Sequence, residues 1–288
     1  MVNFVLPVFN GIIGRYYKSG IGMNDYLDGI LVSRAVWKAN SPETVKKTID
    51  AIRENKQKFV IGDCGAFTFF KTKELGFEVT EWQIRGLFDW YDSIGADYGI
   101  TYDYIVPHGT PSFNFQNTHG KEYIYTLRNL TEMKRVYSTG NWKFKLIGAL
   151  QFQNWTTLEK AFQYAYHYDY TYVSIGGLVM GLPMAGDLPF YYKVIDIASK
   201  CSKNYNLKVH LLGMGRTRVL QYITNLDLNI FSVDSSSSYT SIGRSEATDE
   251  NTYLKTFDHI KRQYSACHYT TFKTNTLKTY INDGVVNN

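Results

Sequence analysis

Three aspartates each follow a short apolar run of the kind that forms a buried strand. If those strands end at one place, the three carboxyl groups could act together on a sugar. Asp63 ends the segment KFVIGD, Asp103 lies in DYGITYDY, and Asp234 ends NIFSVD and precedes four serines. One carboxylate can attack a sugar carbon covalently while a second carboxyl transfers a proton to or from the leaving group. Two such displacements retain the configuration at that carbon. The three acids fit chemistry of this kind, provided that the fold brings them together.

Other polar or flexible residues end further strand-like runs. Gln151 ends FKLIGALQ, the pair 176–177 ends YTYVSIGG, and the segment 213–215 ends KVHLLGMG. Glycine at a strand end permits close approach of the backbone to a ligand, although it also fits a tight turn. Each aspartate by itself is likewise compatible with a helix cap or a turn residue. The recurrence of such residues at equivalent positions favours a shared site.

The elements that would position these residues alternate between strand-like runs and amphipathic helical patterns. Strands are predicted over 2–9, 29–37, 58–65, 97–104, 144–151, 170–177, 208–215 and 229–236. Helices are predicted over 41–56, 80–95, 122–137, 157–168, 189–205 and 249–264. The first helix has a Ser41 cap and Pro42 at its first position. The series predicts an α/β fold, a single (β/α)8 barrel over residues 1–288, with a doubly wound open sheet as the alternative.

Two long irregular stretches, 105–120 and 235–250, are predicted to be loops after the fourth and the last strand. In a barrel, the carboxyl ends of all strands meet at one face, and the loops of that face carry function. The three aspartates are therefore expected to meet at the mouth of the barrel.

Composition places the chain among folded proteins with an ample core. Of its 288 residues, 44% are apolar and 20% charged, and the net charge of +5 permits a polyanionic partner without requiring one. The aromatic content of 16%, with 24 tyrosines, suits either stacking on bases or a tyrosine-rich core. The odd set of three cysteines suggests a reducing compartment and hence the cytoplasm. No membrane-length apolar segment and no signal peptide is predicted.

Several common catalytic motifs are absent from the sequence. It has no phosphate-binding G-x-x-x-x-G-K-[ST] motif, no G-x-G-x-x-G fingerprint and no nucleophile elbow for a Ser-His-Asp site. The six histidines show no metal-ligand spacing, and Cys267-His268 is an isolated pair, so neither a metal site nor a cofactor is predicted.

Six segments together resemble the motifs of the queuine and archaeosine tRNA-guanine transglycosylases, in order and in spacing. They are DCGAF (63–67), TYDYIVP (101–107), GALQ (148–151), SIGGL (174–178), HLLGMG (210–215) and FSVDSSSSY (231–239). The resemblance covers about residues 58–245 and implies a (β/α)8 barrel that exchanges guanine in a polynucleotide for a 7-deazaguanine.

The resemblance also implies roles for particular residues. Asp234 would be the nucleophile on the sugar C1′ and Asp63 the general acid and base. Asp103 and Gln151 would hydrogen-bond the edge of the base. The remaining base contacts would come from the backbone of Gly177, Leu178 and Gly213, and from a sandwich of Phe67 with Leu212 or Met214.

The chain departs from the tRNA enzymes in one respect that affects the substrate. Those enzymes carry a C-x-C-x-x-C…H zinc site after the nucleophile, and archaeal members add an RNA-binding domain, whereas the sequence after Asp234 shows neither. The chain is more similar to the compact DpdA-type transglycosylases of phages and bacteria, which insert 7-deazaguanines into DNA. The resemblance thus implies the cytoplasm, and the host cytoplasm if a phage encodes the chain. DNA and a free base such as 7-cyano-7-deazaguanine are therefore the expected partners, with tRNA as the alternative.

Basic residues after the late strands could contact the phosphates of such a partner, or could simply form a solvated surface. They are Arg216, Arg218, Arg244, Lys255, Lys261 and Arg262. Two other functions remain open: a barrel nucleosidase or glycosidase that transfers the sugar to water, and an inactive barrel that only binds nucleic acid.

Overall fold

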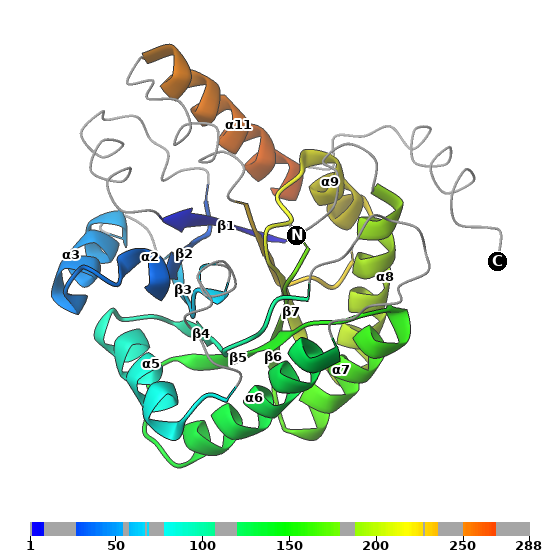
Figure 1. Ribbon diagram of the computed structural model, residues 1–288. Helices are drawn as coiled ribbons and strands as arrows, with labels where there is room; N and C mark the ends of the chain where they lie inside the picture. Colours follow the sequence, from blue (N-terminus) through cyan, green and yellow to red (C-terminus); the bar gives the residue numbers. More distant parts are fainter. Residues whose placement is uncertain are drawn as a thin grey trace.

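Eight short parallel strands pair in the order of the chain, and the last pairs with the first to close a barrel (Figure 1). The computed structural model describes residues 2–8, 27–53, 58–66, 68, 78–106, 120–178, 188–226, 228–235 and 250–268. The strands are β1 (Asn3–Val8), β2 (Gly29–Ser33), β3 (Phe59–Asp63), β4 (Tyr98–Ile100), β5 (Lys145–Leu150), β6 (Tyr172–Ile175), β7 (Lys208–Leu211) and β8 (Ser232–Asp234).

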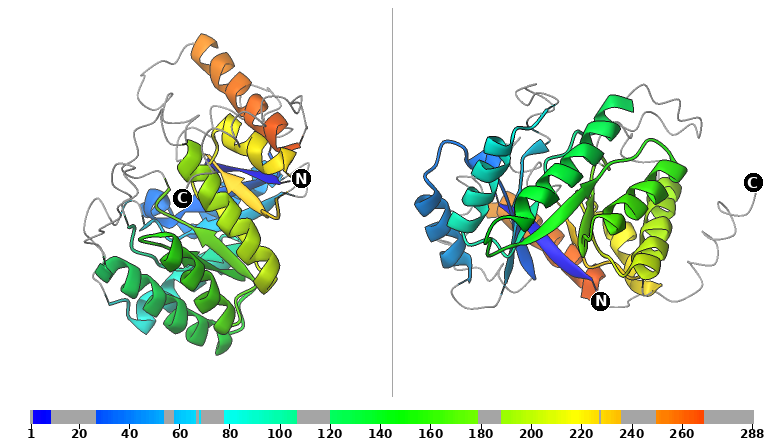
Figure 2. Two further views of the ribbon diagram at one scale, coloured as in Figure 1. Left: turned by 90° about the vertical axis from the view of Figure 1, so that its right-hand side faces the viewer. Right: turned by 90° about the horizontal axis from the view of Figure 1, so that it is seen from below.

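A ring of helices surrounds the strands, as the views in Figures 1 and 2 show. They are α2 (Arg34–Trp37), α3 (Pro42–Arg53), α5 (Glu81–Ser93), α6 (Gly120–Ser138), α7 (Trp155–His167), α8 (Leu188–Tyr205), α9 (Thr217–Asn225) and α11 (Glu250–His268). Capping boxes fix the starts of α5 and α7, where Thr80 and Asn154 each accept from a backbone N–H three residues on. Because these helices return the chain to the amino end of the barrel, each following strand runs in the same direction.

The amino end of the barrel is closed by four mutually packed rings. Phe59, Tyr98, Tyr172 and Phe231 lie with neighbouring ring centroids 5.0 to 5.7 Å apart. Gly29 belongs to this packing because a Cβ at that position would lie 2.7 Å from the Phe59 ring. The rings fill the base of the barrel, so polar side chains that enter its interior approach from the carboxyl end.

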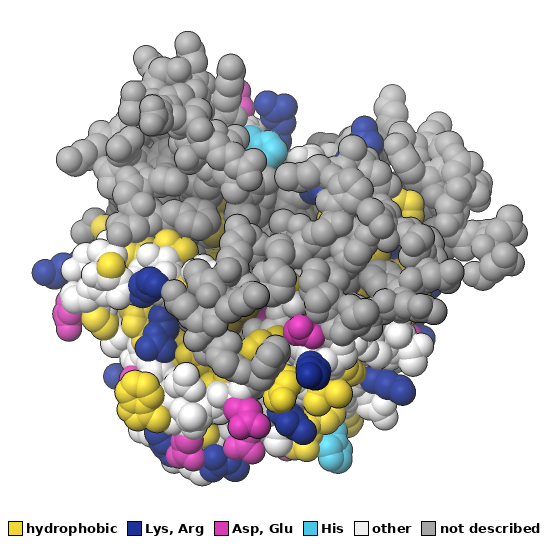
Figure 3. All heavy atoms as spheres, viewed as in Figure 1, with side chains coloured by type: hydrophobic (Ala, Val, Ile, Leu, Met, Phe, Trp, Pro, Cys, Tyr) yellow, Lys and Arg dark blue, Asp and Glu magenta, His cyan; other side chains and the backbone are white. Residues whose placement is uncertain are grey.

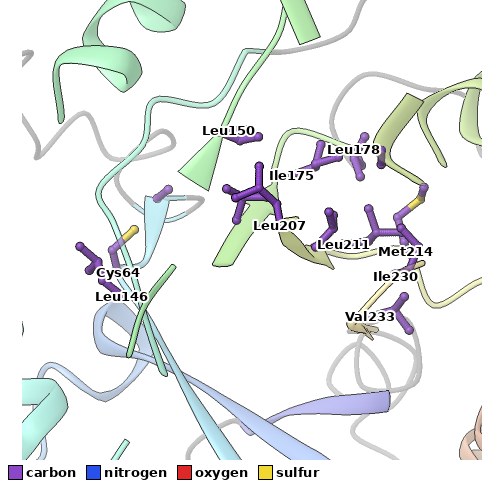
Figure 4. Packing of buried hydrophobic residues seen from close by; sticks show 14 of the residues in the cluster. Cys64, Leu146, Leu150, Ile175, Leu178, Leu207, Leu211, Met214, Ile230 and Val233 are labelled. Atoms are coloured by element: carbon purple, nitrogen blue, oxygen red, sulfur yellow. The ribbon is translucent and has the colours of Figure 1, made fainter. Parts of the chain in front are cut away.

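Apolar side chains fill both the interior of the barrel and the shell between strands and helices. Interior residues such as Val5, Leu31 and Ile61 form one cluster, distinct from the larger outer core. Figure 4 shows part of that outer core, where Leu178, Leu211 and Met214 lie among other apolar side chains. Burial on this scale is the main stabilising contribution to the fold.

The structure confirms the barrel that the alternation of elements predicts, and it corrects several boundaries. Most strands end earlier than predicted: residues 34–37 form the helix α2, and residues 101–106 continue from β4 without pairing as a strand. The helix α9 was missed, since its short segment directly follows the HLLGMG turn. Most of the two predicted long loops, 107–119 and 236–249, lies outside the described residues.

Among the helices that the structure describes, none combines the length and the apolar character needed to cross a membrane.

Candidate active site

The three aspartates lie at the carboxyl end of the barrel, on three different strands. Asp63 ends β3, Asp234 ends β8, and Asp103 lies in the extended segment after β4. Their charges reach one another, because Asp234 contributes to a raised pKa of Asp63, and Asp63 contributes to a raised pKa of Asp103. Acids from distant parts of the sequence thus share one electrostatic environment, as expected for a barrel site.

Asp234 is buried, with 5% of its surface exposed, and is held through one oxygen. Its Oδ1 accepts a hydrogen bond of 2.8 Å from the backbone N–H of Gly213 and lies 3.4 Å from Nε2 of His210. Gly213 has a φ of 74°, a conformation that favours glycine and turns its N–H toward the carboxylate. Among the described residues, Oδ2 of Asp234 has no partner, so one oxygen is available for reaction.

His210 was not predicted as a site residue, although it belongs to the HLLGMG segment. It is 1% exposed, and its Nδ1 lies 2.8 Å from the hydroxyl oxygen of Ser232. His210 and Ser232 are register partners on β7 and β8, so both side chains point to the same side of the sheet. The alternation of side chains along a strand could have found it, because His210 lies two residues before Leu212.

Asp63 has a raised pKa of about 6. Burial is the largest cause, and the charge of Asp234 adds to it, while hydrogen bonds from Ser33 and from the Gly65 N–H (3.1 Å) act in the opposite direction. Gly65 has a φ of 91°, and a Cβ there would lie 2.4 Å from that of Ala35. A carboxyl that exchanges its proton near neutral pH suits an acid that later acts as a base.

Asp103 and Gln151 are paired with each other. Nε2 of Gln151 donates to Oδ2 of Asp103 at 2.5 Å, and Oε1 of Gln151 accepts from the Val106 N–H at 3.1 Å. The Cys64 thiol donates to the other oxygen of Asp103 at 3.7 Å. Gly176 makes room for this pair, since a Cβ there would lie 2.4 Å from Nε2 of Gln151.

Burial raises the pKa of Asp103 to about 7, against the opposing effect of the Gln151 hydrogen bond. The resemblance implied that this side chain reads the base edge, for which an ionised carboxylate could only accept hydrogen bonds. Its surroundings instead allow protonated and ionised forms to coexist near neutral pH. Asp103 can therefore donate as well as accept a hydrogen bond there.

The structure distinguishes the two residues expected to contact the ring of the base. Leu212 is half-buried and packs against the interior cluster, whereas Met214 is 1% exposed and belongs to the outer core (Figure 4). Leu212 is thus the better placed of the two, and Phe67 lies outside the described residues. The carbonyl of Leu178 already accepts a hydrogen bond of 3.1 Å from the Tyr191 hydroxyl, and Gly177 adopts a φ of 76°.

Four of the candidate phosphate contacts lie on α9 and α11, which pack against each other. Arg218, Lys261 and Arg262 are exposed, while Arg216 caps α9 and lies over the Tyr191 ring at 4.8 Å. Lys255 lies on α11, and Arg244 is outside the described residues. In the lower part of Figure 3, basic and acidic side chains are interspersed with apolar ones.

Within the described part of the chain, no group of three or more His, Cys, Asp or Glu side chains is arranged to hold a metal ion. What the site can do follows from its own groups: a buried carboxylate held through one oxygen, a carboxyl that can exchange a proton near neutral pH, and a polar pair beside them. No protein-family model and no curated protein matches the sequence.

Proposed function

We propose that the chain is a base-exchange transglycosylase that replaces guanine in DNA with a 7-deazaguanine through a covalent aspartyl-sugar intermediate. The observation that carries this proposal is the gathering of Asp63, Asp103 and Asp234 at one end of the barrel in three different environments. Different environments support different roles, because a nucleophile, a proton carrier and a base-reading group need different protonation behaviour.

In the first displacement, Oδ2 of Asp234 attacks C1′ of the nucleotide. The bond between C1′ and N9 of guanine breaks, its electron pair leaves with the base, and the proton of the Asp63 carboxyl passes to the departing guanine. In the second displacement, N9 of the incoming base attacks C1′ and loses its proton to Asp63, and the ester bond breaks to restore the Asp234 carboxylate. Configuration at C1′ is retained, as in retaining glycoside hydrolysis.

Asp103 and Gln151 would read the edge of the base. An ionised carboxylate accepts from the N1–H and the 2-amino group of guanine, and both the leaving and the incoming base carry this edge. Leu212 would contact the ring. A base within a duplex must first be extruded or presented single-stranded before C1′ is accessible.

DNA is the proposed polymer because the motifs resemble those of the compact DpdA-type transglycosylases, which act on DNA. The exposed basic residues Arg218, Lys261 and Arg262 supply positive charge that a DNA backbone would attract.

The test is incorporation of a labelled 7-deazaguanine into DNA and into tRNA under matched conditions, read by nucleoside mass spectrometry. The proposal predicts the modified nucleoside in DNA, with loss of an equal amount of guanine, and none in tRNA. Faster labelling of tRNA would reassign the polymer. Release of guanine without incorporation would indicate a nucleosidase, and binding without either product would indicate an inactive barrel.

A further inference from the structure

We infer that His210 is a positioning residue for the nucleophile: its Nε2–H and the Gly213 N–H together hold Oδ1 of Asp234, so that Oδ2 faces the sugar. This inference rests on the proposed function. Nothing in the motif resemblance assigned a role to His210. Its place beneath Asp234, inside the barrel, carries the inference.

The two neighbours of His210, Asp234 and Ser232, indicate which ring nitrogen carries the proton. A carboxylate oxygen only accepts hydrogen bonds, so the ring nitrogen facing Asp234 must carry a proton to attract it. In the neutral ring, Nδ1 is then an acceptor and takes the hydrogen bond of the Ser232 hydroxyl at 2.8 Å. Ser232 therefore fixes both the orientation of the imidazole and the nitrogen that holds the proton.

The contact between His210 and Asp234 is close but not yet a hydrogen bond. The two atoms are 3.4 Å apart, which is within the range of an ion pair, yet Nε2 of His210 has no partner with hydrogen-bond geometry among the described residues. A small movement of either side chain would bring the Nε2–H of His210 into hydrogen-bond distance of Oδ1. Hydrogen bonds at catalytic sites are often long without substrate and shorten when it binds.

The two donors would act on the atom whose charge changes during the reaction. When Oδ2 bonds to C1′, Oδ1 becomes the carbonyl oxygen of the ester. When that ester breaks, negative charge returns to Oδ1, and the N–H groups of Gly213 and His210 stabilise it. No bond to His210 is made or broken, and its proton stays on Nε2 throughout.

The experiment measures the rate of covalent adduct formation with a guanine-containing oligonucleotide by rapid quench. We expect His210→Leu to slow this step by about 10- to 100-fold, because a carboxylate held by the Gly213 N–H alone points Oδ2 at C1′ less often. His210→Gln, whose amide can reach Oδ1, should restore most of the rate. The KM for the incoming base should stay unchanged, since His210 does not contact it.

Ser174→Ala is the matched control. Ser174 lies on β6 as the register partner of His210, is fully buried and has no contact with Asp234 among the described residues. Its loss should leave the adduct step unchanged.

A wild-type rate of adduct formation in His210→Leu would overturn the inference. The inference would also fail if His210→Gln formed the adduct as slowly as His210→Leu. If the leucine variant does not fold, Ser232→Ala decides: a slower adduct step supports the inference and an unchanged one overturns it. Failure of the proposed function looks different, because the wild-type protein itself would then form no adduct with DNA.

Discussion

Replacing Asp103 with asparagine should stabilise the protein above neutral pH, because the native fold resists ionisation of this carboxyl. Its pKa is raised from the ordinary 3.8 to about 7 by burial. Between these two values the unfolded chain has released the proton while the native protein still holds it. The native state therefore binds more protons, and the free energy of unfolding falls as the pH rises. The stabilising contribution is complete below pH 3.8 and is lost by about pH 7.

The size of the effect follows from the shift. One pKa unit corresponds to about 1.4 kcal/mol, so the roughly three-unit shift of this buried group costs the wild-type protein on the order of 4 kcal/mol above pH 7. Asparagine fits the same place without that cost. Its oxygen can accept the Gln151 Nε2–H bond, and its amide nitrogen can face the Cys64 sulfur, which is a weak acceptor.

Urea unfolding of the wild-type protein and of Asp103→Asn, followed by circular dichroism from pH 4 to pH 8.5, measures the difference directly. The two proteins should differ little at pH 4, and the variant should become progressively more stable as the pH rises. Asp63 titrates in both, so its contribution cancels except for its coupling with Asp103. Asp89→Asn, an exposed site on α5, is the control and should follow the wild-type curve. Parallel pH curves for the wild-type protein and Asp103→Asn would refute the reasoning.

Three further predictions concern the reaction and the packing around it. Asp63→Asn should lower kcat for base exchange by about 100-fold or more with little change in the KM for the incoming base, because it removes a proton carrier; a raised KM with unchanged kcat would contradict this role. Gly176→Ala should raise that KM by about tenfold, since its methyl group would displace Gln151 and disturb a recognition hydrogen bond. Leu212→Ala should raise the KM with little loss of stability, whereas Met214→Ala should leave the KM unchanged and lower the free energy of unfolding by about 2–5 kcal/mol.

The glycine prediction has a matched control within α5. A Cβ at Gly86 would meet only the end of the Arg34 side chain, at 3.9 Å, so Gly86→Ala should be tolerated and should stabilise the helix by about 0.5–1 kcal/mol. If Gly176→Ala is equally harmless to base binding, the close packing against Gln151 does not matter for recognition. The Leu212→Ala and Met214→Ala variants are controls for each other. Equal effects on the KM would contradict the placement of Leu212 against the interior cluster and of Met214 in the outer core.

The sequence predicted the order of strands and helices, and with it the end of the barrel where the acids lie. This succeeds because a polar residue directly after an apolar run marks the strand end, as for Asp63 and Asp234. It fails where strand register decides. Alternation along the strand places His210 on the same side as Leu212, but the contact of His210 with Asp234 depends on the pairing of β7 with β8, which no local pattern contains. Leu212 and Met214 could not be told apart because the left-handed Gly213 between them breaks the alternation of sides.

Local sequence patterns also failed to predict two helices, for different reasons. Arg34–Trp37 continues the apolar run of β2 without a break, so α2 was read as part of the strand. The helix α9 is short, and although Val219, Leu220 and Ile223 form its buried face, that pattern spans little more than one turn. Helices of this length are stabilised by packing against their neighbours rather than by their own sequence.

The covalent role of Asp234 is tested most directly by intact-mass spectrometry under denaturing conditions, after incubation of the protein with a guanine-containing DNA oligonucleotide. A species with the mass of the protein plus the oligonucleotide minus guanine is expected, with the attachment mapped to Asp234 by peptide analysis. Asp234→Asn, which keeps the shape of the side chain, should form none. An adduct of normal yield in that variant, or attachment to another residue of the wild-type protein, would contradict the account.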